Sequence, residues 1–401
     1  MISLASIIER FESACLTQYQ NAILPSQRHA LAAMKLCRSK MAPRMLAQCS
    51  ACDEQRFVPH SCGHRNCPHC QHFESQRWIE RQTGRLVAGS YFLITFTLPA
   101  ELRGLAWKHQ RTVYAQLMQC AWETLRTFSQ NHRQLQGSPG AVAVLHTHSR
   151  TLGFHPHVHV VMPAAALDAD KGLWRTLRKS AKGAGKGGDG GGGGYLFNHK
   201  ALALVFRAKL LAALAQEGLT LPADLPEKWV VDCKCVGNGH KALVYLGRYL
   251  YRGVIQERDI IGCENGQVTY RFRDSETRKM MLRTVSGATF LWLVLQHVLP
   301  KGFRRSRNFG FLHPNSQAFD FAAEVVGVQT TCCPAHRAHP TASTAVHLLW
   351  RTHGDRAAKD IAIHCRAADA RAASQSGHIG HPRHPCASAL WVLRTGSGHA
   401  L

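Results

Sequence analysis

The sequence lacks any hydrophobic run long enough to cross a membrane. A transmembrane helix needs about 20 consecutive apolar residues, and the longest apolar stretch, Ala288 to Leu299, is interrupted by Gln296 and His297. The N-terminus also lacks the basic segment and the cleavage pattern of a signal peptide. We therefore expect no membrane partner and a cytoplasmic location.

Acidic residues are scarce relative to basic ones. The 401 residues include 49 Lys and Arg but only 25 Asp and Glu, a formal net charge of +24. A surplus of this size favours a polyanionic partner, most often nucleic acid, over a basic surface kept only for solubility. The hydrophobic content of 45% is enough for two or more domains.

Two segments lack the patterns of ordered domains. The glycine-rich run at residues 183–194 does not have the spacing of a phosphate-binding loop, so we interpret it as a flexible insertion. The segment 316–401 is rich in Ala, Arg, His and Pro and has little periodicity, above all after Val328. We expect this tail to be mostly disordered, or to be out-of-frame read-through.

Hydrophobic periodicity predicts an α+β fold in the remainder of the chain. Strands are expected at 91–99 and 229–236, a hairpin at 141–163, and helices at 104–131, 201–217, 241–252 and 286–299. A second hairpin, 259–274, turns at Asn265-Gly266. We predict a helical, zinc-binding domain over 1–86, and over 87–315 a domain with a central, mainly antiparallel sheet flanked by helices.

The 15 cysteines point to metal binding, because thiols stay reduced in the cytosol. Two C-x-x-C pairs, Cys49 with Cys52 and Cys67 with Cys70, have the spacing of a zinc ribbon. Four thiolates leave no open position for catalysis, so this Zn²⁺ is expected to be structural. Further possible ligands nearby are Cys37, Cys62, His64 and His69.

Alternating histidines predict a second metal site. His155, His157 and His159 share one face of their strand, which is a suitable arrangement for a divalent cation such as Mg²⁺ or Mn²⁺. His146 on the partner strand is expected to complete the site, although His148 has the same parity. The alternative is a solvated strand face. The absence of Asp and Glu nearby disfavours a metallohydrolase that activates water.

Two tyrosines share one face of the helix at 241–252. Tyr245 and Tyr249 lie one turn apart, whereas Tyr251 falls off that face. A phenol beside a metal-neutralised phosphodiester can act as a nucleophile, although such pairs more often serve only in packing. Basic residues on this helix and in the segment PKGFRRSRN are candidate phosphate contacts: Arg248, Arg252, Lys301, Arg304, Arg305 and Arg307.

Zinc knuckles, histidine strand and tyrosine helix, in this order, resemble the HUH-type two-tyrosine transposases of the insertion-sequence-91 family. The resemblance covers residues 25–315 and includes SCGHRNCPHCQ, LHTHSRTLGFHPHVHVVMP, YLGRYLYRGVI and HVLPKGFRRSRNFGFL. It implies that His157 and His159 are paired metal ligands, that Tyr245 and Tyr249 are nucleophiles, and that the N-terminal domain binds zinc. The glycine-rich insertion and the tail depart from the family pattern.

The resemblance implies a transposase that nicks single-stranded DNA at transposon ends and transfers it to target DNA. The intermediate would be a 5′-phosphotyrosine, as in rolling-circle transposition. A rolling-circle replication initiator or relaxase would use the same chemistry. A non-catalytic zinc-ribbon regulator is the alternative from another class, and it would have no use for aligned imidazoles.

Overall fold

A computed structural model describes most of the chain: residues 2–39, 41–49, 55–168, 170–177, 196–251, 253–274 and 277–316, and three short segments further on. Contacts divide the chain into two compact units. The first contains residues 1–35 and 63–332, and the second contains 36–62 and 333–401. The N-terminal helices therefore belong to the unit that carries the central sheet, while the expected boundary at residue 86 stays a prediction. The glycine-rich insertion lies outside the described residues.

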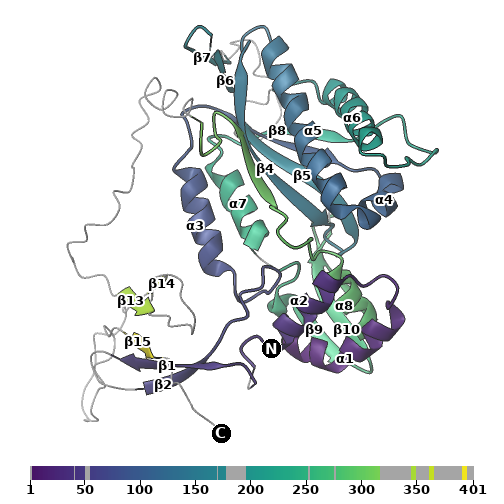
Figure 1. Ribbon diagram of the computed structural model, residues 1–401, viewed down its shortest axis with the longest axis vertical. Coiled ribbons are helices and arrows are strands. Elements are labelled where there is room, and N and C mark those ends of the chain that lie inside the picture. The colour runs from purple at the N-terminus through teal and green to yellow at the C-terminus, as the bar shows by residue number, and fades with distance from the viewer. Residues whose placement is uncertain are drawn as a thin grey trace. The chain divides into compact units, whose positions relative to one another are not determined.

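The first unit is built on a seven-stranded antiparallel sheet with the strand order β7-β6-β4-β5-β3-β8, and β12 also pairs with β4 (Figure 1). The expected hairpin forms its centre. The strands are β3 (Tyr91–Thr97), β4 (Ser138–His148), β5 (Phe154–Pro163), β6 (Ala165–Asp168), β7 (Leu173–Thr176), β8 (Val231–Cys235) and β12 (Ser306–Gly310).

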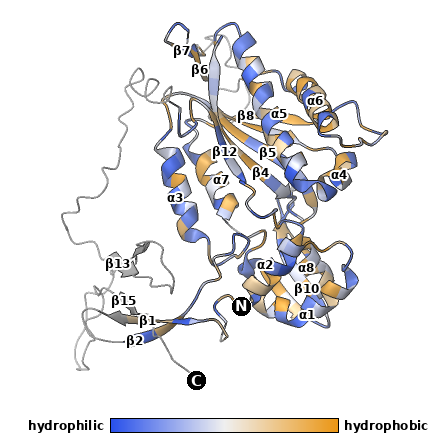
Figure 2. Ribbon diagram, in the orientation of Figure 1, coloured by the Kyte–Doolittle hydropathy of each residue, from blue (hydrophilic) through white to orange (hydrophobic). Residues whose placement is uncertain are grey.

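Helices cover both faces of this sheet, so its central strands are apolar on both sides. On one face, Ile94, Phe96 and Val158 pack against α5 (Gln110–Asn131) and α6 (His199–Gln216). On the other face, Val144 and Val161 pack against α3 (His72–Thr83) and α7 (His240–Tyr251). Figure 2 shows that α3 is largely hydrophilic. This agrees with its burial, since only Ser75, Trp78 and Ile79 of this helix are buried. The predicted α+β fold with a mainly antiparallel sheet is confirmed.

A three-stranded antiparallel sheet with three helices forms another part of the first unit. It comprises β9 (Ile260–Glu264), β10 (Gln267–Arg273) and β11 (Met280–Ser286), with α1 (Leu4–Gln18), α2 (Pro25–Leu36) and α8 (Gly287–Leu295). The turn between β9 and β10 has φ of 48° at Asn265 and 74° at Gly266, which is the left-handed pair that the Asn-Gly signal predicted. Helix α8 ends earlier than expected.

The remaining elements are short. Helix α4 (Arg103–Lys108) follows the turn η1 (Ala100–Leu102), and the turn η2 (Glu257–Asp259) precedes β9. In the second unit, β1 (Arg44–Cys49) and β2 (Gln55–Pro59) belong to a sheet of order β14-β13-β15-β1-β2, with β13 (Ala345–Leu348), β14 (Ile361–His364) and β15 (Trp391–Arg394). Among the described residues no helix has the length and apolarity that a membrane span requires.

Gly247 sets how closely α3 and α7 approach each other. A Cβ atom at this position would collide with Ile79 and would lie 2.8 Å from Trp78 Cε3. Substitution of Gly247 by Ala should therefore destabilise the protein by about 1–3 kcal/mol, which is typical of overpacking. The free energy of unfolding in urea measures this loss. Gly104→Ala in α4, where a Cβ would meet nothing within 4 Å, is the matched control; equal stability of the two variants would contradict the prediction.

Candidate metal and nucleophile site

Three histidines meet on the face of the central sheet that α7 covers. His146 on β4 pairs with His157 on β5, and Val144 pairs with His159. This register brings one ligand atom from each of His146, His157 and His159 within 4.8 Å of the others. The three imidazoles therefore form one group that can hold a divalent cation.

The hydrogen bonds of the three rings leave nitrogen lone pairs for a ligand. His157 Nδ1 donates to the carbonyl oxygen of His155 at 2.7 Å, so its Nε2 is the unprotonated atom. The Oγ1 atom of Thr95 lies 2.9 Å from His159 Nδ1 and can hold that ring in the same tautomer. The buried Nε2 of His146 has no hydrogen-bond partner among the residues that the structure describes. An orphaned imidazole nitrogen beside two oriented ones fits a metal site.

Burial keeps these rings neutral. It lowers the pKa of His157 to about 4 and that of His159 to about 3, with a further contribution to His159 from the charge of His157. Burial and the neighbouring His159 also lower the pKa of His146 well below its usual value. At neutral pH all three rings are therefore unprotonated, which is the form that binds metal.

Helix α7 brings one tyrosine directly onto this group. The ring of Tyr249 stacks on that of His146 with a centroid distance of 3.3 Å and an interplanar angle of 14°. The Oη atom of Tyr249 is hydrogen-bonded to His148 Nδ1 at 2.8 Å. Tyr245 lies 6.4 Å from Tyr249 between ring centroids and is 54% exposed. Burial raises the pKa of both phenols, so both tyrosines are protonated in the free protein.

His155 does not belong to the group of three that lies within 4.8 Å. Its Nδ1 is 2.6 Å from the guanidinium of Arg103, which can only donate, so this nitrogen serves as an acceptor. Burial and the charge of Arg103 lower the pKa of His155. The expected strand alternation holds for His155, but its Nδ1 bonds to Arg103 and the residue is not part of the candidate metal group.

A second candidate metal group consists of four cysteines. Cys37, Cys62, Cys67 and Cys70 have their sulfur atoms within 4.8 Å of one another. This set shares Cys67 and Cys70 with the expected zinc ribbon, but contains Cys37 and Cys62 in place of Cys49 and Cys52. Cys52 and the side chain of Cys49 lie outside the described residues. Four cysteines in one group fit a tetrahedral structural zinc site.

Comparison with known proteins agrees with this geometry. The family model described as "Putative transposase" matches residues 140–318, which contain the histidines and the tyrosine helix. The model described as "Transposase zinc-binding domain" matches residues 7–98, which contain all four grouped cysteines. The "Putative transposase y4qJ" of Sinorhizobium fredii (strain NBRC 101917 / NGR234) is 32% identical over 333 residues, which are 77% of this chain and 79% of the relative. The chain belongs to the insertion-sequence-91 family of transposases.

A second relative of this transposase is the "Transposase for insertion sequence element IS801" of Pseudomonas savastanoi pv. phaseolicola. It is 29% identical over 266 residues, covering 65% of this chain and 64% of that protein. No solved structure matches the chain. Membership of the family makes DNA the substrate of the transposase, and the matched zinc-binding domain supports a structural Zn²⁺ at the cysteine group.

The basic residues expected to contact phosphate occupy different environments. Arg248, Lys301 and Arg304 are exposed, Arg307 is half-buried, and Arg252 lies outside the described residues. Arg305 is buried: its Nη1 donates to the carbonyl oxygen of Leu250 at the end of α7, and its guanidinium lies 5.9 Å from the Tyr249 ring centre. Arg305 therefore supports the tyrosine helix from within.

Two further histidines of this transposase lie near the site, and the sequence had offered His148 only as an alternative to His146. A β-bulge between His146 and His148 turns His148 toward Tyr249, whereas His146 faces His157. His297 is fully buried, and its Nε2 donates to the carbonyl oxygen of Leu152 in the β4–β5 turn. Its Nδ1 lies 3.2 Å from Thr147 Oγ1. The interruption of the apolar run 286–299 by a polar pair was the available signal for His297.

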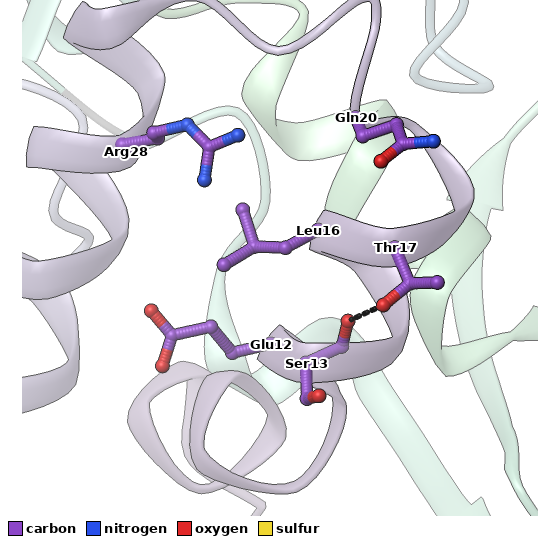
Figure 3. Close-up of a pocket in the computed structure, with 6 residues that line it drawn as sticks. All are labelled: Glu12, Ser13, Leu16, Thr17, Gln20 and Arg28. Carbon is purple, nitrogen blue, oxygen red and sulfur yellow. Dashed lines mark hydrogen bonds between the residues drawn. The ribbon is translucent and has the colours of Figure 1, made fainter.

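A shallow concavity on α1 and α2 is not a candidate site. It has a volume of about 420 Å³ and is lined by Glu12, Ser13, Leu16, Thr17, Gln20 and Arg28 (Figure 3). Its lining contains no histidine, cysteine or tyrosine, and Glu12 is paired with Lys35 at 2.8 Å. The described residues around this concavity therefore do not combine metal ligands with a nucleophile, as the histidine and tyrosine group does.

His297 should make the stability of the transposase depend on pH. Burial lowers the pKa of His297 to about 3, so the native state resists a proton that the unfolded chain accepts below about pH 6.5. Stability due to this residue is present above pH 6.5 and is lost as the pH falls below it, by about 2 kcal/mol at pH 5. The free energy of unfolding in urea should fall less between pH 7 and pH 5 in His297→Gln than in wild type, with a difference of about 2 kcal/mol. The exposed His313→Gln is the control, and an unchanged pH effect in His297→Gln would contradict the assignment.

Proposed function

We propose that this transposase nicks and transfers single-stranded DNA through a covalent link to Tyr249 or Tyr245, as in rolling-circle transposition. The contact that carries the proposal is the stacking of Tyr249 on His146, whose buried Nε2 has no hydrogen-bond partner in the described part of the chain. A nucleophile held against a candidate cation site is what phosphoryl transfer requires, because the phosphate charge must be neutralised next to the attacking oxygen.

His146, His157 and His159 are the residues that would hold the cation, which we propose to be Mg²⁺ or Mn²⁺. Bound there, it would neutralise the charge of the scissile phosphate. Thr95 and the main-chain carbonyl of His155 keep two of the three rings in orientation. His155 itself is expected to stay bonded to Arg103.

The reaction proposed for Tyr249 is a transesterification. Its Oη attacks the phosphorus, the new P–Oη bond forms a 5′-phosphotyrosine, and the bond from phosphorus to the 3′ oxygen breaks. His148 is placed to accept the phenol proton, because a hydrogen bond of 2.8 Å already joins its Nδ1 to Oη. The leaving oxygen takes a proton and becomes a free 3′-OH. The energy of the phosphodiester is kept in the adduct, so rejoining needs no ATP.

Tyr245 is suited to a second cleavage while the first DNA end stays attached. It lies one helical turn from Tyr249 and is the more exposed of the two. The proposed substrates are single strands at the transposon ends and target DNA. Arg248 is exposed between the two tyrosines, where its fork can bind a phosphate.

Replacement of both tyrosines should abolish the covalent product. Labelled single strands spanning the element ends are mixed with protein and Mg²⁺ or Mn²⁺ and separated on denaturing SDS gels. Wild type should give a metal-dependent protein–DNA band, which the double variant Tyr245→Phe and Tyr249→Phe should lack, while DNA binding stays near normal. His157→Ala should lose the metal-dependent band as well.

Tyr19→Phe, at the C-cap of α1, is the matched control and should give the wild-type band. A covalent band that persists in the double tyrosine variant would rule out the proposed nucleophiles. DNA binding by wild type without any band, with either metal and on several candidate ends, would support the non-catalytic DNA-binding alternative.

We propose further that Cys37, Cys62, Cys67 and Cys70 are the ligands of the structural zinc. Loss of any one thiolate removes a ligand of the tetrahedral site, and water replaces that ligand poorly. Since the bound zinc contributes to the stability of the fold, each such loss also destabilises the protein. Cys37→Ser and Cys62→Ser should each lower the zinc content of purified protein, measured by atomic emission, as much as Cys67→Ser does. Cys49→Ser and Cys52→Ser are matched controls expected to keep one zinc per chain. Loss of zinc in Cys49→Ser and Cys52→Ser, but not in Cys37→Ser and Cys62→Ser, would instead support the two C-x-x-C pairs as the ligands.

A further inference from the structure

A large groove lies on the first unit, apart from the histidine group. Its volume is about 1950 Å³, and it is lined by α3, by the segment 298–309, and by parts of α2 and α5. Ordinary small-molecule pockets measure roughly 300–1,000 Å³. The groove is therefore of a size for a segment of a polymer.

The charge of the lining is almost entirely positive. Among the described residues, the lining contains seven arginines and Lys301 but one carboxylate, that of Glu74. Burial lowers the pKa of Arg307 and of Arg305, and the neighbouring cations Arg304 and Arg65, respectively, lower these values further. Gathering like charges costs stability, and a bound polyanion removes that cost.

Several guanidinium groups in the groove are held by main-chain oxygens. Arg65 donates to the carbonyl of Phe303 at 2.8 Å, and Arg111 donates to that of Lys301 at 2.5 Å. These bonds fix the side chains and leave the remaining N–H groups of each fork able to bind phosphate.

The groove and the proposed nucleophile lie on different faces of helix α7. Tyr249 contacts His146, whereas Tyr251 lines the groove. Two residues at 3.6 per turn are separated by about 200° around the helix axis. A strand whose phosphate lies at Tyr249 is thus on the other side of α7 from the groove.

We infer that this groove binds a second segment of single-stranded DNA, one that is held but not cut there. The inference rests on the proposed function for the nature of the substrate. Half-buried aromatic rings among the cations, those of Tyr251 and Phe309, favour a single strand, because bases stack on such rings without regard to sequence. Holding two strands at once is what an exchange of strands requires.

The test is a binding measurement in the Tyr245→Phe and Tyr249→Phe background, where the proposed cutting is blocked. A labelled oligothymidylate is titrated over a range of salt concentrations. Lys301→Gln with Arg304→Gln should reduce the slope of log K against log salt by about 1.4, since each phosphate contact on a single strand contributes about 0.7. The affinity at 0.1 M salt should fall by roughly 25-fold, which is this slope change taken over the tenfold range from 1 M salt. Arg81→Gln, on the opposite wall, should reduce the slope by about 0.7.

Matched controls remove the same charge outside the groove. Arg77→Gln on the same helix α3, and Arg126→Gln with Arg133→Gln, should leave the slope unchanged. Short strands of about six nucleotides should bind with two equivalents per chain in the parent and one in the groove variant. Thermal melting and zinc content of each variant verify that it is folded.

The groove assignment is overturned if the groove variants bind like their controls, if the parent binds a single short strand, or if duplex of the same length binds as well as single strand. The proposed function fails independently, if wild type binds DNA but forms no covalent band. The two results are read from different assays, so each can fail alone.

Discussion

The antiparallel pairing of β4 with β5 is the interaction on which the candidate site depends. Its register sets His146 opposite His157 and Val144 opposite His159, and this alone gathers three imidazoles. The bulge that follows His146 gives the next histidine of the strand another direction, toward Tyr249. His146 and His148, which have equal parity in the strand, thus take different partners: His146 joins the candidate metal group and His148 bonds to Tyr249.

Covering this face of the sheet with α7 has an electrostatic consequence. The helix excludes water from the histidines, so their proton affinity falls and their lone pairs stay available. The same burial disfavours ionisation of Tyr249. The free site is therefore a neutral cluster with a buried cation, Arg305, beneath it. No carboxylate among the described residues acts on these histidines, so the phosphodiester itself would bring the negative charge that faces the metal ion and Arg305.

Much of the fold followed from short-range patterns. The alternation in residues 155–163, the buried strand at 91–97 and the Asn265-Gly266 turn each depend on neighbours in sequence, and the structure has them. Helix α7 was also placed from periodicity. Strands β6, β7, β11 and β12 were not predicted, because short or half-exposed segments carry little pattern and depend on distant partners.

The site shows the same division. Strand alternation indicated His157 and His159, and the spacing of one helical turn indicated the pair Tyr245 and Tyr249. Local spacing could not distinguish the roles of His155, His148 and Arg305, because these depend on a bulge, on Arg103 and on the end of α7. The cysteine group illustrates the limit most clearly, since Cys37 is 25 residues from Cys62 and no local motif joins them.

The close approach of α3 to α7 at Gly247 connects the two candidate metal sites, the cysteine group and the histidine group. Cys70 precedes the first residue of α3 by two positions, and Ser75 on this helix donates a buried hydrogen bond to the carbonyl oxygen of Gly247. Gly247 in turn lies between Tyr245 and Tyr249. Any loosening of the cysteine group would free the start of α3, and with it the brace behind the tyrosines. Oxidation of the thiols or loss of the zinc would thus lower transposase activity from a distance, without any change at the histidine and tyrosine group.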